Sequence, residues 1–313
     1  MVILKQYSNI SKVFRHDSVP LTLNCTVFLN NLFIRRPSML RSSTSLRLFG
    51  VKNCPTLAMS ATMTDAEVKE VVAALGLRCP PVLLTASPIL SHIKFSIIRR
   101  PSNNFGIDGT STCDGKRQPG LMDILLRVYL KQYVRDLKLG RKPKKCIIFS
   151  RGINTLGDIY SRLMELTNYR YSDCNDSPFV LNHSSLLPPT EKVIRERSSE
   201  ISLYLSSNKM LMGIDLEEID IVIFLRPFNQ LSALIQGAGR GGRRQGNGLR
   251  RRVQVYQLYN TQDFNDRHMS LKMKEICLST DCTRKLLKNH FVGESTQDSV
   301  KDGHCCHCCD LSA

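Results

Sequence analysis

Residues 219–225 read IDIVIFL, and Asp220 is the only polar residue in this run of seven. Such a run predicts a strand that is buried on both faces of a sheet. Similar or shorter apolar runs lie at 145–149 (KCIIF), 178–182 (PFVLN), 201–205 (ISLYL) and 253–259 (VQVYQLY). Helices are predicted at 120–138, before the first of these strands, at 153–166 and from about residue 229. Short apolar strands alternating with helices predict an α/β lobe with a doubly wound parallel sheet over residues 120–262.

The regions on either side of this lobe have a different composition. Residues 100–119, RPSNNFGIDGTSTCDGKRQP, are rich in glycine and polar turn formers and predict a linker. Upstream, the apolar run TLAM and the helical pattern TDAEVKEVVAALGL, with Thr64 or Asp65 as N-cap, suggest a small part of another lobe. We therefore assign residues 1–99 to a partial first lobe with a poorly ordered N-terminus, and residues 263–313 to a helical tail.

The charge of the chain favours a polyanionic partner. Lysine and arginine total 44 against 27 acidic residues, which gives a formal net charge of +17. Nucleic acid is the first expectation and an anionic membrane surface the second. No segment has the length and apolar character of a membrane span, and residues 1–15 lack the apolar core of a secretory signal. We expect contact with nucleic acid and none with a membrane.

The cysteines predict a metal site. The chain has twelve cysteines, and four of them lie in HCCHCC at 304–309. Without a secretory signal, cysteines that crowd at one end of a chain favour metal ligation over disulfides. Thiolates are the ligands that structural zinc prefers, and four of them complete a tetrahedral site. The alternative is a cysteine-rich segment without a bound metal.

The segment QGAGRGGRR at 236–244 carries the clearest functional signal. Arg240 and Arg243 lie three residues apart on a glycine-rich turn that follows a predicted helix. The planar guanidinium group matches phosphate oxygens, and glycines allow close approach of the backbone. A basic surface loop or an arginine/glycine-rich RNA-binding patch is the alternative interpretation. From Gln236 to Arg252 there are six arginines and no acid.

Four segments in order make the chain resemble superfamily 2 helicases, and the RecQ group most closely. They are Ser60-Ala61-Thr62, CIIFSRG at 146–152, MGID at 212–215 and QGAGRGGR at 236–243, which resemble motifs III, IV, V and VI. The order of four motifs is far more specific than any one of them. The resemblance implies a RecA-like C-terminal helicase lobe preceded by a remnant of the first lobe.

The same resemblance implies roles for individual residues. Arg240 and Arg243 are the expected arginine fingers, which stabilise charge on the transferred γ-phosphate, with Gln236 beside them. Gly213, Asp215 and Gly239 are the expected nucleotide-site residues, and Ser60 and Thr62 are expected to couple hydrolysis to unwinding. The basic run itself, rather than the resemblance, predicts DNA-phosphate contacts at Arg244, Arg250, Arg251 and Arg252, and a solvated turn is the alternative. Simpler roles are that Asp215 ends a strand and that Ser60 and Thr62 cap a helix.

The tail also resembles the RecQ group. Residues 273–294, MKEICLSTDCTRKLLKNHFVGE, are similar to the helix pair that carries the first zinc cysteine of that family. Cys282 is then a ligand together with three of Cys305, Cys306, Cys308 and Cys309. The family pattern around the last cysteine is not reproduced at Asp310, so three other residues remain alternative ligands: Cys277, His304 and His307.

Two motifs that such a motor needs are missing from the sequence. There is no glycine-rich loop ending in Gly-Lys-Ser/Thr, and no Asp-Glu box precedes motif III. The resemblance implies an ATP-dependent 3′–5′ DNA helicase that uses ATP and Mg²⁺ on single-stranded or forked DNA. This truncated chain is expected to need a complementing helicase chain with a complete first lobe.

Other functional interpretations remain open. The first is a non-enzymatic DNA-binding module with structural zinc, and the second is a degenerate reading frame without a stable product. We expect a nuclear location, with a mitochondrial one as the alternative, because the first 36 residues contain a single acidic residue.

Overall fold

The computed structural model describes residues 26–28, 57–59, 64–74, 91–101, 108, 112–113, 116–117, 119–169, 176–183, 186, 188–207, 216, 219–242, 251–292, 305–306 and 309. The chain divides into two compact units. The first unit comprises Met1–Ile89 with Leu287–Asp298, and the second comprises Leu90–Leu286 with Ser299–Ala313.

The first unit contains two short parallel strands and one helix. Strand β1 (Thr26–Phe28) pairs with β2 (Leu57–Met59), and helix α3 spans Asp65–Ala74. The backbone amide of Thr64 donates to the Glu67 carboxylate at 2.7 Å, and the amide of Glu67 donates to the Thr64 hydroxyl at 3.4 Å. This reciprocal pair is a capping box, so the predicted helix is confirmed and Thr64 is its N-cap.

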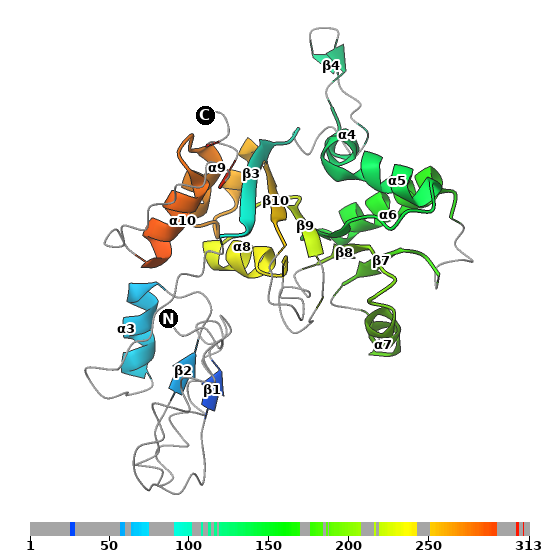
Figure 1. Ribbon diagram of the computed structural model, residues 1–313. Coiled ribbons are helices and arrows are strands. Elements are labelled where there is room, and N and C mark those ends of the chain that lie inside the picture. Colours follow the sequence, from blue (N-terminus) through cyan, green and yellow to red (C-terminus); the bar gives the residue numbers. More distant parts are fainter. Residues whose placement is uncertain are drawn as a thin grey trace, which may run out of the picture. The chain divides into compact units, whose positions relative to one another are not determined.

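The second unit is built on a six-stranded sheet in which every pairing is parallel (Figure 1). The strand order is β3-β10-β9-β6-β8-β7. The strands are β3 (Ile93–Arg99), β6 (Lys145–Phe149), β7 (Phe179–Asn182), β8 (Leu203–Ser206), β9 (Ile219–Phe224) and β10 (Val253–Tyr259). Every residue of β6 and β8 is buried. The prediction of a covered parallel sheet from short apolar runs is confirmed.

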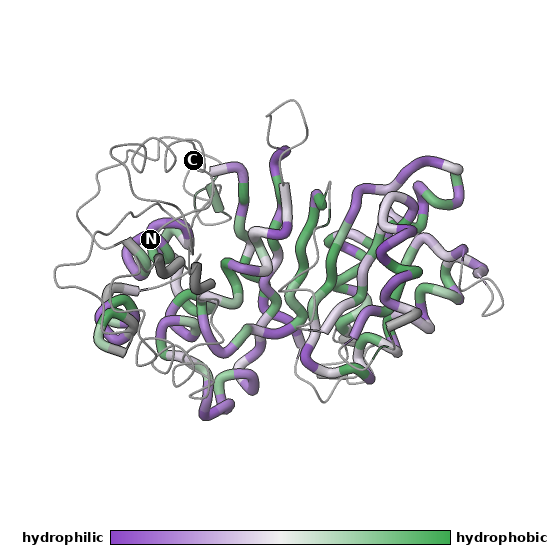
Figure 2. Tube along the Cα trace, turned by 90° about the horizontal axis from the view of Figure 1, so that it is seen from below, coloured by the Kyte–Doolittle hydropathy of each residue, from purple (hydrophilic) through white to green (hydrophobic). Residues whose placement is uncertain are grey.

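Both faces of this sheet are covered. A continuous helix formed by α4 (Leu121–Leu125), the π-helical segment η3 (Leu126–Leu130) and α5 (Lys131–Lys138) packs with α6 (Ile153–Thr167) on one face. On that face they contact strand residues such as Cys146 and Ile148. The intervening residues of the same strands point to the opposite face, where Phe149 stacks on Phe224 with ring centroids 5.3 Å apart. Figure 2 shows hydrophobic and hydrophilic residues alternating along the helices, as this packing requires.

The remaining described elements are short. They are β4 (Thr112–Cys113), antiparallel β5 (Lys116–Arg117), α7 (Pro188–Glu196), α8 (Leu231–Ala238), the 3-10 helix η6 (Thr261–Asn265), α9 (Leu271–Leu278) and α10 (Thr283–Val292). The tail is helical in α9 and α10, as predicted. None of the helices in the described ranges combines the length and apolarity that a membrane crossing needs.

Strand β3 departs from the predicted domain boundary. The sequence places residues 1–99 in the first lobe, but Ile93–Arg99 pairs along its whole length with Val253–Tyr259. The strand therefore belongs to the sheet of the second lobe, and the change of unit falls near residue 90. Lys94, Ser96 and Arg99 interrupt its apolar residues, so it lacks the continuous run that marks the central strands. The predicted linker follows β3 and includes the β4–β5 pair.

Candidate functional site

The glycine-rich arginine segment forms a turn directly after α8, as predicted. The helix ends at Ala238, and residues 239–242 form consecutive turns. The amide of Arg240 donates to the Gly237 carbonyl at 3.1 Å, and the amide of Gly242 donates to the Ile219 carbonyl at 3.0 Å. The second bond attaches the turn to the first residue of β9. We call residues 239–242 the finger turn.

Two glycines of the finger turn are required by its surroundings. A Cβ atom on Gly241 would lie 2.4 Å from a methyl carbon of Val253. Gly242 has a φ of +60°, and a Cβ atom there would lie 2.6 Å from the His92 ring and 2.8 Å from the Arg251 carbonyl oxygen. Only glycine accepts both the left-handed conformation and this close approach. The glycine spacing is thus explained by packing of the turn on the first residues of β9 and β10.

The structure brings together three of the predicted nucleotide-site residues. Gln236 lies in the last turn of α8, Gly239 and Arg240 follow in the finger turn, and all three are half-buried. Arg251 and Arg252 are exposed at the start of β10, and the Arg251 guanidinium lies 3.7 Å from the Asp220 carboxylate. The other predicted residues of these sites lie outside the described residues: Ser60, Thr62, Gly213, Asp215, Arg243, Arg244 and Arg250.

The finger turn lies at the amino ends of the strands. It contacts Ile219 at the start of β9 and Val253 at the start of β10. Open α/β sheets bind their own ligands at the opposite edge, outside the carboxyl ends of the strands. The finger turn therefore lies at the edge opposite to the one where a sheet of this kind binds its own ligand.

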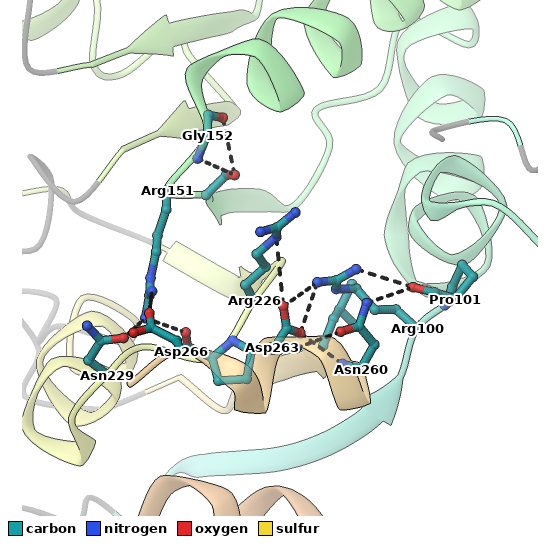
Figure 3. Close-up of polar contacts among 12 residues, drawn as sticks. Arg100, Pro101, Arg151, Gly152, Arg226, Asn229, Asn260, Asp263 and Asp266 are labelled. Atoms are coloured by element: carbon teal, nitrogen blue, oxygen red, sulfur yellow. Dashed lines mark hydrogen bonds and ion pairs between the residues drawn. The ribbon is translucent and has the colours of Figure 1, made fainter. Parts of the chain in front are cut away.

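The carboxyl edge of the sheet carries a polar network instead (Figure 3). Arg100, just after β3, makes two hydrogen bonds of 2.7 and 2.9 Å to the Asp263 carboxylate. Their side chains are only 5% and 4% exposed. Asn260 and Asp263 also form a capping box at the start of η6. Burial lowers the pKa of Arg100, and the Asp263 carboxylate opposes that shift.

Two further arginines join this network from β6 and β9. Arg151 donates to the Asp266 carboxylate at 2.8 Å, to the Pro227 carbonyl at 2.9 Å and to the Asn229 side chain. A backbone hydrogen bond from His268 and the side-chain bond from Arg151 lower the pKa of Asp266. Arg226 lies 3.9 Å from Asp263. Two carboxylates nearly balance the three guanidinium groups, so this network mainly joins strand ends and is a weak candidate for a polyanion site.

A basic stripe on the helix before β6 was not singled out from the sequence. It consists of Arg127, Lys131, Arg135 and Lys138, which recur at helical spacing and are all exposed. None of the four forms an ion pair with a carboxylate of the described residues. We call this set the α5 stripe. Four exposed charges of one sign on one helix are the kind of surface that attracts phosphate groups.

The helix that carries the α5 stripe is held firmly on the sheet. The hydroxyl of Tyr129 donates to the Lys144 carbonyl at 2.5 Å, and the hydroxyl of Tyr133 donates to the Pro178 carbonyl at 3.3 Å. Both rings are buried. The stripe therefore lies on a helix that two buried tyrosines attach to the rest of the lobe.

Four cysteines of the tail form a candidate metal centre. The Sγ atoms of Cys282, Cys305, Cys306 and Cys309 all lie within 4.8 Å of one another. The Sγ atom of Cys305 is 3.3 Å from that of Cys282 and 3.0 Å from that of Cys309. A tetrahedral zinc site with bonds of about 2.3 Å has sulfur atoms roughly 3.8 Å apart, so these residues fit the ion.

The thiols of this cluster differ in acidity. Burial opposes ionisation of Cys306, yet hydrogen bonds involving Cys309 and the Thr283 backbone lower the pKa of its thiol to about 7. Burial raises the pKa of Cys305 to about 11. Contact with the Cys305 thiol raises the pKa of Cys309. A site whose thiols must lose protons is expected to bind a cation with release of those protons.

The structure distinguishes among the predicted ligands. Cys282, Cys305, Cys306 and Cys309 are brought together, whereas Cys277 is buried in α9 and is not part of the cluster. The other three candidates, His304, His307 and Cys308, lie outside the described residues.

The parallel six-stranded sheet with a finger turn after α8 is the fold of the C-terminal lobe of superfamily 2 helicases. Residues 127–245 match the family model described as the helicase conserved C-terminal domain. This match runs from η3 through the finger turn. No curated protein sequence matches the chain significantly.

Solved helicase structures share this fold at low sequence identity. S. cerevisiae Dbp5 bound to RNA and ADP BeF3 is 14% identical with a TM-score of 0.53, over 86% of this chain and 57% of Dbp5. The DUF1998 helicase MrfA, bound to DNA and AMPPNP, is 15% identical with a TM-score of 0.51, over 84% of this chain and 36% of MrfA. Mycobacterium smegmatis Lhr, bound to ssDNA and AMP-PNP, is 17% identical with a TM-score of 0.51, over 76% of this chain and 29% of Lhr. The chain thus spans little more than half of the first of these relatives.

Proposed function

We propose that the chain is the C-terminal motor lobe of a RecQ-like, ATP-dependent 3′–5′ DNA helicase, in which Arg240 serves as an arginine finger. The observation that carries this proposal is the finger turn, which holds Arg240 beside Gln236 at the amino edge of the sheet. The cysteine cluster after the helices supports the RecQ-like assignment. DNA as the substrate and the 3′–5′ direction follow from the resemblance in motifs and tail.

In this proposal ATP and Mg²⁺ are held by a complete first lobe, since the present sequence contains neither a Gly-Lys-Ser/Thr loop nor an Asp-Glu box before motif III. The role of Arg240 would be to place positive charge on the transferred phosphoryl group, an effect worth roughly 10³–10⁵ in rate in characterised enzymes. We expect no ATP turnover above background from the chain alone, with or without DNA.

The lobe is also proposed to bind the phosphate backbone of DNA. The α5 stripe and the exposed Arg251 and Arg252 supply positive charge on described surfaces. Such contacts carry no base sequence information and weaken steeply with salt. If the chain binds DNA but never supports ATP turnover with a complementing first lobe, the second interpretation, a non-enzymatic DNA-binding module, becomes the better one.

The first prediction concerns the salt dependence of DNA binding. Replacing Lys131, Arg135 and Lys138 together by glutamine is expected to reduce the slope of log K against log salt by about 2 to 3, because each lost phosphate contact contributes about 0.9. Affinity near 0.1 M salt should fall roughly tenfold or more. Fluorescence anisotropy with a labelled duplex and a labelled single strand measures both quantities.

A charge-matched control is available on other helices. Arg162, Lys192 and Lys272 are exposed, but each is paired with a glutamate one turn away. Their triple glutamine variant removes the same charge and should leave the salt slope within about 0.5 of the parent value. Equal losses in both triple variants would mean that only net charge matters. A parent chain that does not bind DNA at 50 mM salt would contradict the proposed function itself.

The cysteine cluster is proposed to hold one structural zinc ion, with Cys282, Cys305, Cys306 and Cys309 as ligands. The purified chain should contain about one equivalent of zinc, measured by elemental analysis. Cys306→Ser should reduce the zinc content to near zero, whereas Cys277→Ser, in the buried cysteine outside the cluster, should retain it. Retention of zinc by Cys306→Ser would contradict this ligand set.

A further inference from the structure

Strand β3 is an edge strand, and its outer edge is covered by the tail. Within the sheet β3 pairs only with β10, which leaves one row of its backbone groups without a strand partner. The amide of Phe95 donates to the Cys305 carbonyl at 3.5 Å, and Phe95 and Cys306 form a parallel β-bridge. The two adjacent cysteines of the candidate metal centre therefore extend the sheet by a very short additional segment.

Arg284 covers the next two positions on the same edge. Its guanidinium donates to the Ile93 carbonyl at 2.6 Å and to the Ser91 carbonyl at 3.1 Å. Alternate residues of a strand direct their backbone groups to the same edge, so Ser91, Ile93 and Phe95 form one row. Arg284 is 7% exposed and lies two residues after Cys282, a member of the cluster. Among the described residues, the groups that bond to Ser91, Ile93 and Phe95 on this edge thus belong to the cysteine cluster or adjoin it.

Strand β3 in turn contacts the finger turn. His92 immediately precedes the strand, and its carbonyl accepts a hydrogen bond from the Val253 amide at 2.9 Å. The His92 ring occupies the space where a side chain on Gly242 would lie. Val253 similarly fills the space beside Gly241. A change in the position of residues 91–95 therefore reaches the turn that carries Arg240 through direct packing.

We propose that the cysteine cluster is an edge clamp, which fixes β3 and thereby positions the finger turn, with Arg284 as its positioning residue. The inference rests on the proposed zinc site but adds a role that metal ligation alone does not require. A two-residue bridge is too short to hold itself on a sheet edge, so its attachment depends on the bonds that tie Cys305 and Cys306 to Cys282. Metal binding and the order of β3 are then thermodynamically linked, so that loss of the metal loosens the strand.

The edge clamp predicts that β3 and the finger turn loosen when Arg284 is replaced, but not when the neighbouring Lys285 is replaced. Hydrogen exchange with mass spectrometry is measured on the full chain, on Arg284→Ala and on Lys285→Ala, which changes an exposed residue next to Arg284. Peptides covering 91–99 and 236–242 should exchange at least tenfold faster in Arg284→Ala, while peptides covering 145–149 in the sheet centre keep the parent rate. Lys285→Ala should match the parent in all three regions.

Zinc removal provides the second arm of the test. Cys306→Ser, or titration of the parent chain with a chelator if that variant does not fold, should accelerate exchange in the same two regions as Arg284→Ala. Cys277→Ser is the matched control and should not. Loss of zinc with unchanged exchange at 91–99 would overturn the clamp and leave the zinc site standing. A parent chain that contains no zinc would overturn the zinc site and the clamp together, and unchanged exchange in Arg284→Ala would remove its positioning role.

Discussion

Asp263→Asn is expected to destabilise the second unit by about 3–5 kcal/mol, which would make it one of the most damaging single substitutions in the chain. The Asp263 carboxylate accepts two hydrogen bonds from Arg100, and both side chains are almost completely buried. Asparagine keeps the size of the side chain but removes the charge, so the Arg100 guanidinium remains buried beside a neutral group. The same change weakens the capping box with Asn260 at the start of η6.

Urea unfolding followed by circular dichroism measures this loss as a lower midpoint with an unchanged slope. Glu165→Gln is the control, because it also neutralises an acid that is paired with an arginine. The Glu165 side chain is 63% exposed and that of its partner Arg162 is 45% exposed. Exposed pairs contribute about 0–1 kcal/mol, so this control should unfold nearly as the parent does. Similar midpoints for Asp263→Asn and Glu165→Gln would show that the buried pair contributes little.

The sequence was a good guide to the central strands because they are buried on both faces. Residues 145–149 and 219–225 are almost wholly apolar, and such runs have few alternatives to a covered parallel sheet. Strand β3 escaped detection for the opposite reason. It is an edge strand with Lys94 and Ser96 among its apolar residues, and its partner β10 lies about 160 residues away in the sequence. Pairing across such a distance leaves no local signal.

The candidate sites show the same contrast between local and distant contacts. The spacing of Arg240 and its glycines is a local pattern, and it predicted a turn after a helix, which the structure contains. The α5 stripe was also visible, as Arg127, Lys131, Arg135 and Lys138 at helical spacing, but it was not recognised as a surface. By contrast, the bond between Arg100 and Asp263 joins residues 163 positions apart. Nothing in the neighbourhood of either residue identifies the other.

The cysteine cluster could be predicted from the sequence only in part. Composition predicted a metal site and the family resemblance selected Cys282, but adjacent cysteines at 305–306 and 308–309 left the ligand set open. The choice depends on the backbone path. Cys305 and Cys306 lie beside Phe95 on the edge of β3, and the Sγ atom of Cys305 lies 3.3 Å from that of Cys282. A tertiary contact of this kind cannot be inferred from cysteine spacing.

Gly242→Ala is expected to destabilise the second unit by about 2–4 kcal/mol and to distort the finger turn. A left-handed conformation costs a residue with a Cβ atom about 1–2 kcal/mol. The new methyl group would also lie 2.8 Å from the Arg251 carbonyl oxygen, part of the backbone at the start of β10, and 2.6 Å from the His92 ring. Crowding of this kind costs a further 1–3 kcal/mol in typical cores. Urea unfolding measures the stability, and hydrogen exchange of residues 236–242 reports on the turn.

The matched substitution is Gly157→Ala, which adds the same methyl group within α6. A Cβ atom at Gly157 would meet nothing within 4 Å, and the residue is helical, so alanine should stabilise the protein by about 0.5–1 kcal/mol. The two glycine variants should therefore shift the unfolding midpoint in opposite directions. If Gly242→Ala instead left both the midpoint and the exchange of the turn unchanged, the turn would have to relax without its contacts to His92 and Arg251. In that case the packing that places Arg240 would not depend on this glycine.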